Sequence, residues 1–477
     1  MSNTTVAIVG AGFSGSVLAI QLLHHGGPNL RVDLIERRGT FGPGLPYATD
    51  REEHLLNVPA ARMSAFPDKP SHFLDWLGRQ PHTILGNVSP DPGAFVPRRL
   101  FGLYLQNTLA EADASRLQRV IGTVVSLAQT ATGATLSFEN RAPLTADCAV
   151  IATGNNTIVP PAGIDAAIAG SAMFRNDPWA EDACADLPSD CAVLAIGTGL
   201  TMVDAFLQLT ARGHTGPTHA LSRRWWAPRT HAAPTTTPPP DASAFPRRLL
   251  PLLRFVRSEA ARIVAAGGTW QSVVDALRPM TQQLWQGWSN AERRRFLVHL
   301  RPAWDVHRHR VAPSVGELLA TAQASGRLTI HAGRIAGIAA TGEVSWQPRG
   351  TTERRVLQVG RIVNCTGAAS DIARSDCPLT RALLASGQAR PDPQRLGLDT
   401  TAMGALIDRD GAESRRLFGV GPVCRSALWE IVAVPDIRVQ CEALARRIAA
   451  IVQRDDEPEA QKCTEHSKEM ATAVASS

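Results

Sequence analysis

The sequence predicts an α/β protein that contains two similar strand–turn–helix units, and three observations support this prediction. The first unit begins within ten residues of the N-terminus, where a short apolar strand runs into a glycine-rich turn. The second unit begins near residue 191 and repeats that order. Two further apolar segments, 149–154 and 362–367, each end in Thr-Gly. A chain of 477 residues also has room for two or three domains, each with its own core.

The first unit has the order of a Rossmann dinucleotide-binding fold. A strand over Thr5–Val9 is followed by the turn Gly10-Ala-Gly12-Phe-Ser-Gly15, a helical pattern to about residue 25, and a second strand over 31–36. Gly10 allows the tight turn, Gly12 lets the backbone approach a pyrophosphate, and Gly15 lets the helix pack against the strand. Glu36 ends the second strand and is expected to accept hydrogen bonds from ribose hydroxyls.

The second unit repeats this order with two departures. A strand over 191–196 runs into Gly197-Thr-Gly199, but Met202 occupies the third glycine position, so helix and strand must pack differently. The next strand, 218–222, is followed by Arg223 and Arg224 instead of an acidic residue. Arginines would hold a 2′-phosphate that an acid would repel. This favours NADPH over NADH, although two surface arginines in an arginine-rich chain leave NADH open.

The charges of the chain are unevenly distributed. The net charge is +6, and Lys69, Lys462 and Lys468 are the only lysines among 49 basic residues. Kinase, P-loop ATPase and pyridoxal-phosphate chemistry each need a dedicated lysine, so these classes are disfavoured. Residues 211–310 hold sixteen arginines against five acidic residues. The segment contains a Pro/Thr-rich loop over 227–246, which is followed by helical patterns. It favours binding of small anions over nucleic acid or membrane, because no recognition motif accompanies it.

The cysteines and the N-terminus indicate a cytoplasmic protein. Eight cysteines are scattered without a C-x-x-C pair, which is typical of reduced thiols and disfavours a flavin disulfide reductase. No secretory signal pattern is visible, and no metal-ligand spacing stands out. The uncharged stretch 7–23 is explained by the first Rossmann helix without a membrane span. Beyond about residue 454 the sequence is polar, which predicts a disordered tail over 454–477.

Longer strings carry a resemblance to a known family. They are 41–49 (FGPGLPYAT), 54–59 (HLLNVP), 61–64 (ARMS), 96–102 (VPRRLFG), 304–310 (WDVHRHR), 418–422 (FGVGP) and 429–436 (WEIVAVPD). With the Gly10–Gly15 turn, they resemble the bacterial FAD/NAD(P)-binding flavoproteins with two dinucleotide-binding domains, relatives of the flavin monooxygenases. The resemblance extends to about residue 450. It is strongest to the FAD-dependent urate hydroxylase branch.

The resemblance and the repeated unit together imply a discontinuous FAD domain into which an NAD(P) domain is inserted. The expected boundaries are an FAD domain over 1–155 and 361–453, an NAD(P) domain over 156–230 and 313–360, and a helical Arg/Trp-rich insertion over 231–312. Residues expected to contact FAD are Gly10, Gly12, Ser14, Gly15, Glu36, Gly44, Asn57, Thr153, Gly154 and Gly421. Those expected to contact NADPH or NADH are Gly197, Gly199, Arg223 and Arg224.

The resemblance also implies an activity. A monooxygenase of this type reduces FAD with NAD(P)H and activates O2 as a flavin hydroperoxide, and the branch implies hydroxylation of urate to 5-hydroxyisourate in purine catabolism. Two alternatives share the architecture: an N-hydroxylase of an amino acid or amine, and an NAD(P)H-dependent flavin reductase that inserts no oxygen. A nucleotide-binding regulator that uses the basic segment is a third, from a different class.

The segment 304–310 supplies the candidate catalytic residues. His307 and His309 are two apart, which suits an extended strand with both side chains on one face. We expect a histidine to manage a proton, together with Arg308, and Arg310 to pair with an anionic substrate. Arg62 and Arg98 are further candidates for anion contacts. The alternative is a solvated basic turn without a catalytic role.

Overall fold

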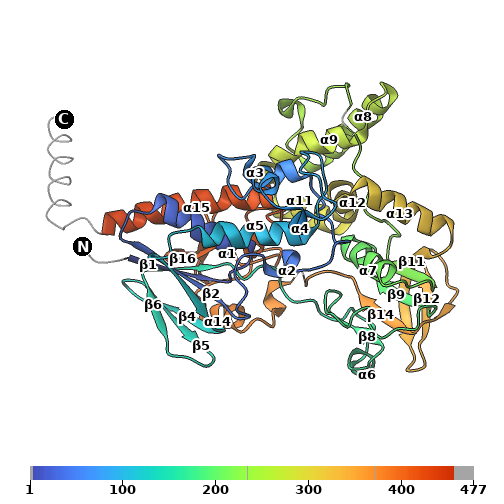
Figure 1. Cartoon of the computed structure of the whole chain (residues 1–477), viewed down its shortest axis with the longest axis horizontal. Coiled ribbons are helices and arrows are strands. Elements are labelled where there is room, and N and C mark those ends of the chain that lie inside the picture. The colour runs from blue at the N-terminus through green and yellow to red at the C-terminus, as the bar shows by residue number, and fades with distance from the viewer. Residues whose placement is uncertain (1–3, 234, 370, 456–477) are drawn as a thin grey trace.

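The computed structural model describes residues 4–233, 235–369 and 371–455. Two parallel sheets lie at opposite ends of the molecule, and a group of helices lies above the second sheet in the view of Figure 1. The predicted α/β fold class with two Rossmann-like units is therefore confirmed. Most of the predicted tail, 456–477, lies outside the described residues, and the last described helix continues to Asp455.

The first sheet has the strand order β15-β16-β7-β1-β2-β3, in which only β15 is antiparallel to its neighbour. Its central strand β1 is an apolar run buried on both faces, as expected for a parallel sheet covered by helices. A three-stranded antiparallel sheet, β4-β5-β6, adjoins it. The strands are β1 (Thr4–Val9), β2 (Leu30–Glu36), β3 (Leu117–Ile121), β4 (Val124–Gln129), β5 (Ala134–Phe138), β6 (Leu144–Ala146), β7 (Cys148–Ile151), β15 (Ala405–Ile407) and β16 (Glu413–Gly419).

Helix α1 explains the long uncharged stretch near the N-terminus. Its residues from Phe13 to Leu23 are all buried, since the helix lies between the first sheet and α15 (Figure 1). The Cys441 thiol of α15 donates to the Ser14 carbonyl oxygen at 3.4 Å. The helices packed around this sheet are α1 (Phe13–His25), α2 (Gly44–Tyr47), α3 (His72–Gly78), α4 (His82–Leu85), α5 (Arg98–Ala110), α14 (Pro378–Ser386) and α15 (Val434–Asp455).

The second sheet has the order β13-β12-β11-β10-β9-β14-β8, and the five strands from β11 to β8 are parallel. In both sheets the first strand of the unit lies between its second strand and a strand from later in the chain, as a Rossmann fold requires. The elements are β8 (Phe174–Arg175), β9 (Val193–Ile196), β10 (Thr218–Ser222), β11 (Leu328–Ile338), β12 (Glu343–Pro348), β13 (Arg355–Gln358) and β14 (Arg361–Asn364), with α6 (Ala166–Ala169), α7 (Leu200–Ala211) and α13 (Pro313–Ala324).

The insertion is helical and has its own apolar core. Trp285 and Trp288 lie in that core, and Trp429 from the C-terminal part of the chain stacks on Trp285 with ring centroids 4.9 Å apart. The insertion is therefore packed against the C-terminal part of the chain as well as joined to the domain of the second sheet. Its helices are α8 (Leu249–Ala265), α9 (Trp270–Leu277), α10 (Thr281–Gly287), α11 (Asn290–Arg295) and α12 (Arg301–Arg308), with a π-helical turn over Phe296–Leu300.

Two sequence predictions need correction. Strand β14 pairs with β9, so Arg361–Asn364 belongs to the second sheet and not to the returning FAD domain. The segment of His307 is helical and not extended. Among the described residues, no helix combines the length and apolar character needed to cross a membrane.

Candidate active site

The first glycine turn is fixed by its contact with the strand beside it. Gly10 has a φ of +109°, and a Cβ there would lie 2.4 Å from the carbonyl oxygen of Ala152, which follows β7. A Cβ at Gly15 would lie 1.8 Å from the Gly10 carbonyl oxygen. This turn lies where β1 separates β2 from β7, which is the point at which open α/β sheets bind ligands.

Glycines from three segments of the chain lie close together at the N-terminus of α1. A Cβ at Gly44 would lie 2.9 Å from the Gly12 Cα, and a Cβ at Gly421 would lie 2.3 Å from the Ser14 hydroxyl. No acidic residue is present in the first turn of the helix. The first turn of α1 thus offers backbone N–H groups and the positive end of the helix dipole with no acidic side chain of its own, which fits the diphosphate of a dinucleotide.

Glu36 is the last residue of β2, and its carboxylate also stabilises the first glycine turn. Its Oε2 accepts from the Ala11 N–H at 3.1 Å and its Oε1 from the Arg38 N–H at 3.0 Å. Each carboxylate oxygen keeps a second lone pair, so contact with ribose hydroxyls is still compatible with this geometry. Thr153 and Gly154 follow β7, and no atom lies within 4 Å of a Cβ built at Gly154.

The second glycine turn repeats the first in detail. Gly197 has a φ of +115°, and a Cβ there would lie 2.4 Å from the carbonyl oxygen of Cys365, just after β14. Gly199, at φ −84° and ψ −167°, matches Gly12 at −73° and −168°. The departure is at Met202, which is buried in the core of the second domain. The pair of turns therefore uses the same close approach to a neighbouring strand.

The two arginines after β10 have different environments. Arg224 donates to the carbonyl oxygens of Val298 and His299, at 3.0 and 3.1 Å, and so ties β10 to the insertion. Arg223 is exposed. Of the pair expected to hold a 2′-phosphate, Arg223 is the one whose guanidinium faces solvent.

Arg98 connects the two domains. Its guanidinium makes a two-bond ion pair with Asp204 of α7, at 2.8 and 2.9 Å, and its Nε donates to the Leu55 carbonyl oxygen at 3.0 Å. All three nitrogens are engaged and the charge is compensated in a mostly buried setting. Arg98 is therefore engaged in holding the two domains together, and we do not expect it to contact an anionic substrate. The sequence concealed this because Asp204 is 106 residues away.

The segment around Asn57 is tied to the start of the insertion by a residue that sequence reasoning missed. His231 Nε2 lies 3.0 Å from the Asn57 carbonyl oxygen and donates to it. Burial lowers the pKa of His231, and the nearby Arg310 acts in the same direction. The ring is therefore neutral at physiological pH. No local motif marks His231, because its partner is 174 residues away.

Four arginines from three parts of the chain influence one another electrostatically, and we call them the arginine cluster: Arg62, Arg278, Arg308 and Arg310. Arg62 and Arg310 also act on His231. Burial lowers the pKa of Arg278 and of Arg310, and in both cases Arg308 and Arg62 lower it further. Arg308 pairs with Glu430 at 3.2 Å, Arg278 with Asp436 at 3.3 Å, and Arg310 with Asp275. Arg62 is exposed. The cluster is thus a mixed-charge group with one more cation than anions.

Glu430 is a central residue that the sequence did not reveal. It accepts hydrogen bonds from Trp304 Nε1 and from Arg308, and His309 Nε2 lies 3.8 Å away. Burial raises the pKa of Glu430. It has a φ of +63°, a strained conformation for a residue other than glycine. Such strain is retained where surrounding contacts determine the geometry, and here three side chains converge on one carboxylate.

His307, in the last turn of α12, and His309, which directly follows the helix, have different environments. His307 donates from Nδ1 to the Ala303 carbonyl oxygen at 2.7 Å, which leaves Nε2 as its acceptor nitrogen, and its ring meets Trp270 edge-on. Burial and the neighbouring Arg308 lower the pKa of His309 to about 4.

Stability should decrease on acidification because of His309. Its pKa is about 4 in the folded state against an ordinary 6.5, so the unfolded chain binds the extra proton between these pH values. His309→Gln should remove this dependence and lessen the loss of unfolding free energy between pH 7 and pH 5 by about 1–2 kcal/mol. Urea denaturation at both pH values measures this. The exposed His82→Gln is the control, and an unchanged pH dependence in His309→Gln would refute the assignment.

The two glycine turns on two parallel sheets define an architecture with two dinucleotide-binding domains. Residues 7–156 match a family model described as FAD-NAD(P)-binding. The first part of the chain is therefore an FAD/NAD(P)-binding domain, as the sequence predicted. A search of curated proteins found no match. Among the described residues, no group of three or more metal-ligating side chains is close enough to hold a metal ion.

Three solved structures illustrate the similarity of fold. An ornithine N-hydroxylase from Kutzneria sp. 744 has a TM-score of 0.62 and 15% identity, covering 96% of this chain and 100% of its own. L-Lysine 6-monooxygenase from Pseudomonas syringae has a TM-score of 0.61 and 16% identity, covering 95% of this chain and 100% of its own. A cadaverine monooxygenase from Erwinia amylovora, bound to FAD, has a TM-score of 0.62 and 12% identity, covering 94% of each chain.

Proposed function

We propose that the chain is an FAD-dependent monooxygenase that uses NADPH and hydroxylates the amino group of a small zwitterionic substrate such as an amino acid. The observation that carries the proposal is the arginine cluster, two members of which act on His231, the residue that donates to Asn57 of the FAD/NAD(P)-binding domain. When bound, FAD supplies the oxygen-activating chemistry after reduction by the nicotinamide cofactor. The protein then has to orient the substrate and exclude water.

The residues of the cluster fit a molecule that carries both charges. Arg62 would hold a carboxylate, since its guanidinium is exposed and adds the uncompensated positive charge. Asp275 and Asp436, each next to an arginine, offer acceptors for an ammonium group. His307, with Nε2 as its acceptor nitrogen, is the candidate for taking up a proton, whereas His309 has a pKa too low to act as a base near neutral pH.

N-hydroxylation has better support than hydroxylation of urate. The sequence resemblance implied urate, but the similar structures are named as hydroxylases of ornithine, lysine and cadaverine. The excess of arginine is compatible with urate as an anion, and no feature of the site selects a purine. The ornithine N-hydroxylase structure contains NADP+, which, with Arg223, supports NADPH as the reductant.

A substrate screen tests the proposal. The flavin-loaded protein is incubated with NADPH, O2 and either ornithine, lysine, cadaverine or urate, while NADPH oxidation, peroxide and hydroxylamine product are measured together. We expect one amine to stimulate NADPH oxidation and to yield hydroxylamine in near-equal amount. Loss of urate absorbance with no amine product would restore the urate assignment. NADPH oxidation that ends only in peroxide with every substrate would favour the reductase.

Arg62 provides a direct test of the arginine cluster. We expect Arg62→Ala to raise the KM for the amino-acid substrate about tenfold or more, because a charge-assisted bond to the carboxylate is lost. Its kcat should change much less, and cadaverine, which has no carboxylate, should be affected less than ornithine or lysine. Arg79→Ala, an exposed arginine after α3, is the control. Equal effects on cadaverine and amino acids would contradict the carboxylate contact.

Arg223 should determine the preference for the nicotinamide cofactor. In Arg223→Ala we expect the KM for NADPH to rise about tenfold while that for NADH stays nearly constant, since only NADPH carries the 2′-phosphate. Initial rates of cofactor oxidation measure both. Arg254→Ala, on the exposed face of α8, is the matched control. If the KM values for NADH and NADPH rise by the same factor, Arg223 does not bind the 2′-phosphate.

A further inference from the structure

Trp225 lies in the loop that follows β10, and its side chain is 54% exposed. Among the exposed large apolar side chains of the described residues, it is the only aromatic one. Its indole makes no hydrogen bond or ring contact with any of these residues. A single exposed apolar side chain is common on protein surfaces, so a role for this ring has to be argued from the backbone and the neighbours of Trp225.

The backbone of Trp225 has a conformation that suits glycine. Its φ is +54°, in the left-handed region, which a residue with a Cβ adopts at an energetic cost. Such conformations persist where the surrounding structure fixes them, and they are frequent at ligand sites. A glycine would form the same turn without strain. The turn itself therefore gives no reason for a tryptophan at this position.

Both neighbours of Trp225 are anchored, whereas its own ring is not. Arg224 donates to two carbonyl oxygens of the insertion, and its guanidinium lies 5.7 Å from the centre of the Trp226 ring. The Trp226 carbonyl oxygen accepts from the Thr198 hydroxyl at 2.6 Å. These contacts fix the backbone of Trp225 from both sides. The loop thus uses one of its two tryptophans internally and presents the other to solvent.

Thr198 places this loop beside the second glycine turn, of which it is the middle residue. Its Oγ1 lies 2.9 Å from the hydroxyl of Ser222, the last residue of β10. The Gly197 N–H donates to the Leu221 carbonyl oxygen at 2.8 Å. In Rossmann folds, the residue that ends the second strand of the unit contacts the ribose of the adenosine. Strand β10 is that second strand, so Trp225 lies at the edge of the sheet where the adenosine is expected.

Arg223 is exposed on the same short loop and is the proposed contact of the 2′-phosphate. Arg223 and Trp225 are two residues apart, so their Cα atoms are at most about 7 Å from each other. In NADPH a single ribose separates the 2′-phosphate from the adenine. A guanidinium and an indole at this spacing therefore match the two ends of a 2′-phosphoadenosine group. Aromatic side chains bind bases by stacking on their faces.

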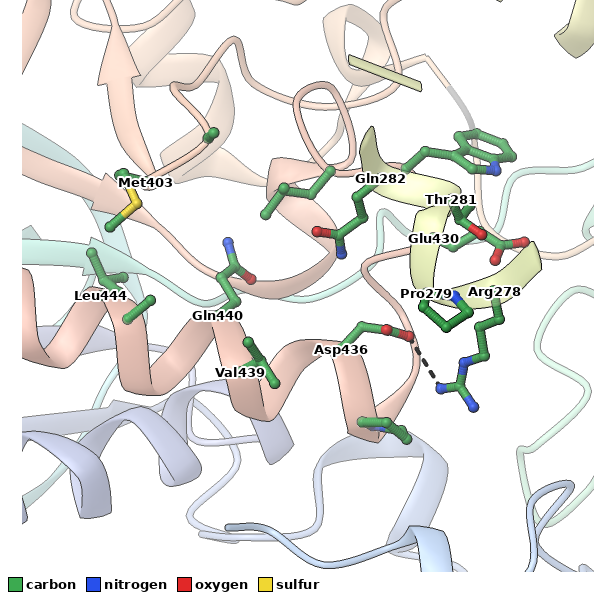
Figure 2. A pocket seen from close by; sticks show the side chains of 15 residues that line it. Arg278, Pro279, Thr281, Gln282, Met403, Glu430, Asp436, Val439, Gln440 and Leu444 are labelled. Atoms are coloured by element: carbon green, nitrogen blue, oxygen red, sulfur yellow. Dashed lines mark hydrogen bonds and ion pairs between the residues drawn. The ribbon is translucent and has the colours of Figure 1, made fainter. Parts of the chain in front are cut away.

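We propose that the indole of Trp225 stacks on the adenine of the nicotinamide cofactor and, with Arg223, forms the site for its 2′-phosphoadenosine group. The stack rests on the proposed use of NADPH and adds a binding residue to it. It is separate from the arginine cluster, because that cluster borders the cavity of about 310 Å³ in Figure 2, where Arg278 pairs with Asp436. Neither Trp225 nor Arg223 lines that cavity.

Calorimetric titration of the flavin-loaded chain with NADP+ and with NAD+ tests the stack without turnover. We expect Trp225→Gly to weaken both nucleotides about tenfold, because both carry the adenine. Arg223→Ala should weaken NADP+ alone, and Trp225→Phe should stay within about threefold of the parent, since a phenyl ring keeps an aromatic face. A parent chain that binds neither nucleotide would contradict the proposed cofactor and the stack together. Equal affinities of the parent and Trp225→Gly would overturn the stack alone.

A second glycine replacement controls for the change in backbone. Glycine adopts a positive φ without strain, so we expect the melting temperature of Trp225→Gly to be at least that of the parent. Asp186→Gly is the matched control, since Asp186 is exposed before β9 with a φ of +53°, and its affinity for NADP+ should be that of the parent. The stack is overturned if Asp186→Gly weakens NADP+ as much as Trp225→Gly does, or if Trp225→Phe binds as weakly as Trp225→Gly. A crystal structure with NADP+ whose adenine lies away from the Trp225 ring would overturn it as well.

Discussion

Gly10→Ala is expected to destabilise the chain by about 3 kcal/mol or more and to abolish flavin binding. An alanine at this residue would have to keep a φ of +109° while its Cβ lay 2.4 Å from the Ala152 carbonyl oxygen. Gly10 directly follows β1 and Ala152 directly follows β7, so the Cβ could be accommodated only by moving these two neighbouring strands apart. The effect should therefore appear as lost stability as well as lost cofactor.

The matching control is Gly199→Ala in the second turn. Gly199 has a φ of −84°, and no atom lies within 4 Å of a Cβ built there. We expect its unfolding free energy to stay within about 0.5 kcal/mol of the parent, while the KM for NADPH rises because the methyl group occupies the approach of the pyrophosphate. Urea denaturation and flavin absorbance after gel filtration distinguish the two variants. A Gly10→Ala protein that keeps its flavin and its stability would refute the account of the turn.

Asp204→Ala is expected to cost about 3–5 kcal/mol, because it leaves the Arg98 guanidinium mostly buried without a countercharge. The loss should also loosen the contact between the domains, since Arg98 begins α5 and Asp204 lies on α7. Replacing both residues, as in Arg98→Met with Asp204→Leu, should recover most of the stability, because neither charge is then left unpaired.

A double-mutant cycle measured by chemical denaturation tests this coupling. We expect an interaction energy of at least about 2 kcal/mol between the two residues. Flavin reduction by NADPH in the doubly substituted protein shows whether the ion pair also orients the two domains. Additive effects of the single replacements would mean that the ion pair contributes little. A raised substrate KM in Arg98→Met with unchanged stability would restore the substrate contact that the sequence suggested.

Much of the scaffold could be predicted because its requirements are local. A side chain at Gly10 would collide with the neighbouring strand end at Ala152, and one at Gly15 would collide with the turn at Gly10. A strand–turn–helix pattern in the sequence therefore reveals both glycines. The arginine-rich insertion was likewise visible in composition. The helix over 301–308 was missed because His307 and His309 were interpreted through their spacing of two, a pattern that an extended strand and a helix end both permit.

The sequence by itself determined two dinucleotide-type turns, the repeated strand order and the arginine-rich insertion, since backbone conformation and hydrophobic burial depend on nearby residues. Only the tertiary structure decided what the arginines do. In the folded chain Arg98 pairs with Asp204 and Arg308 pairs with Glu430, whereas Arg62 is exposed. The physical reason is that a buried charge is defined by its partner, and each of these partners is more than 100 residues away.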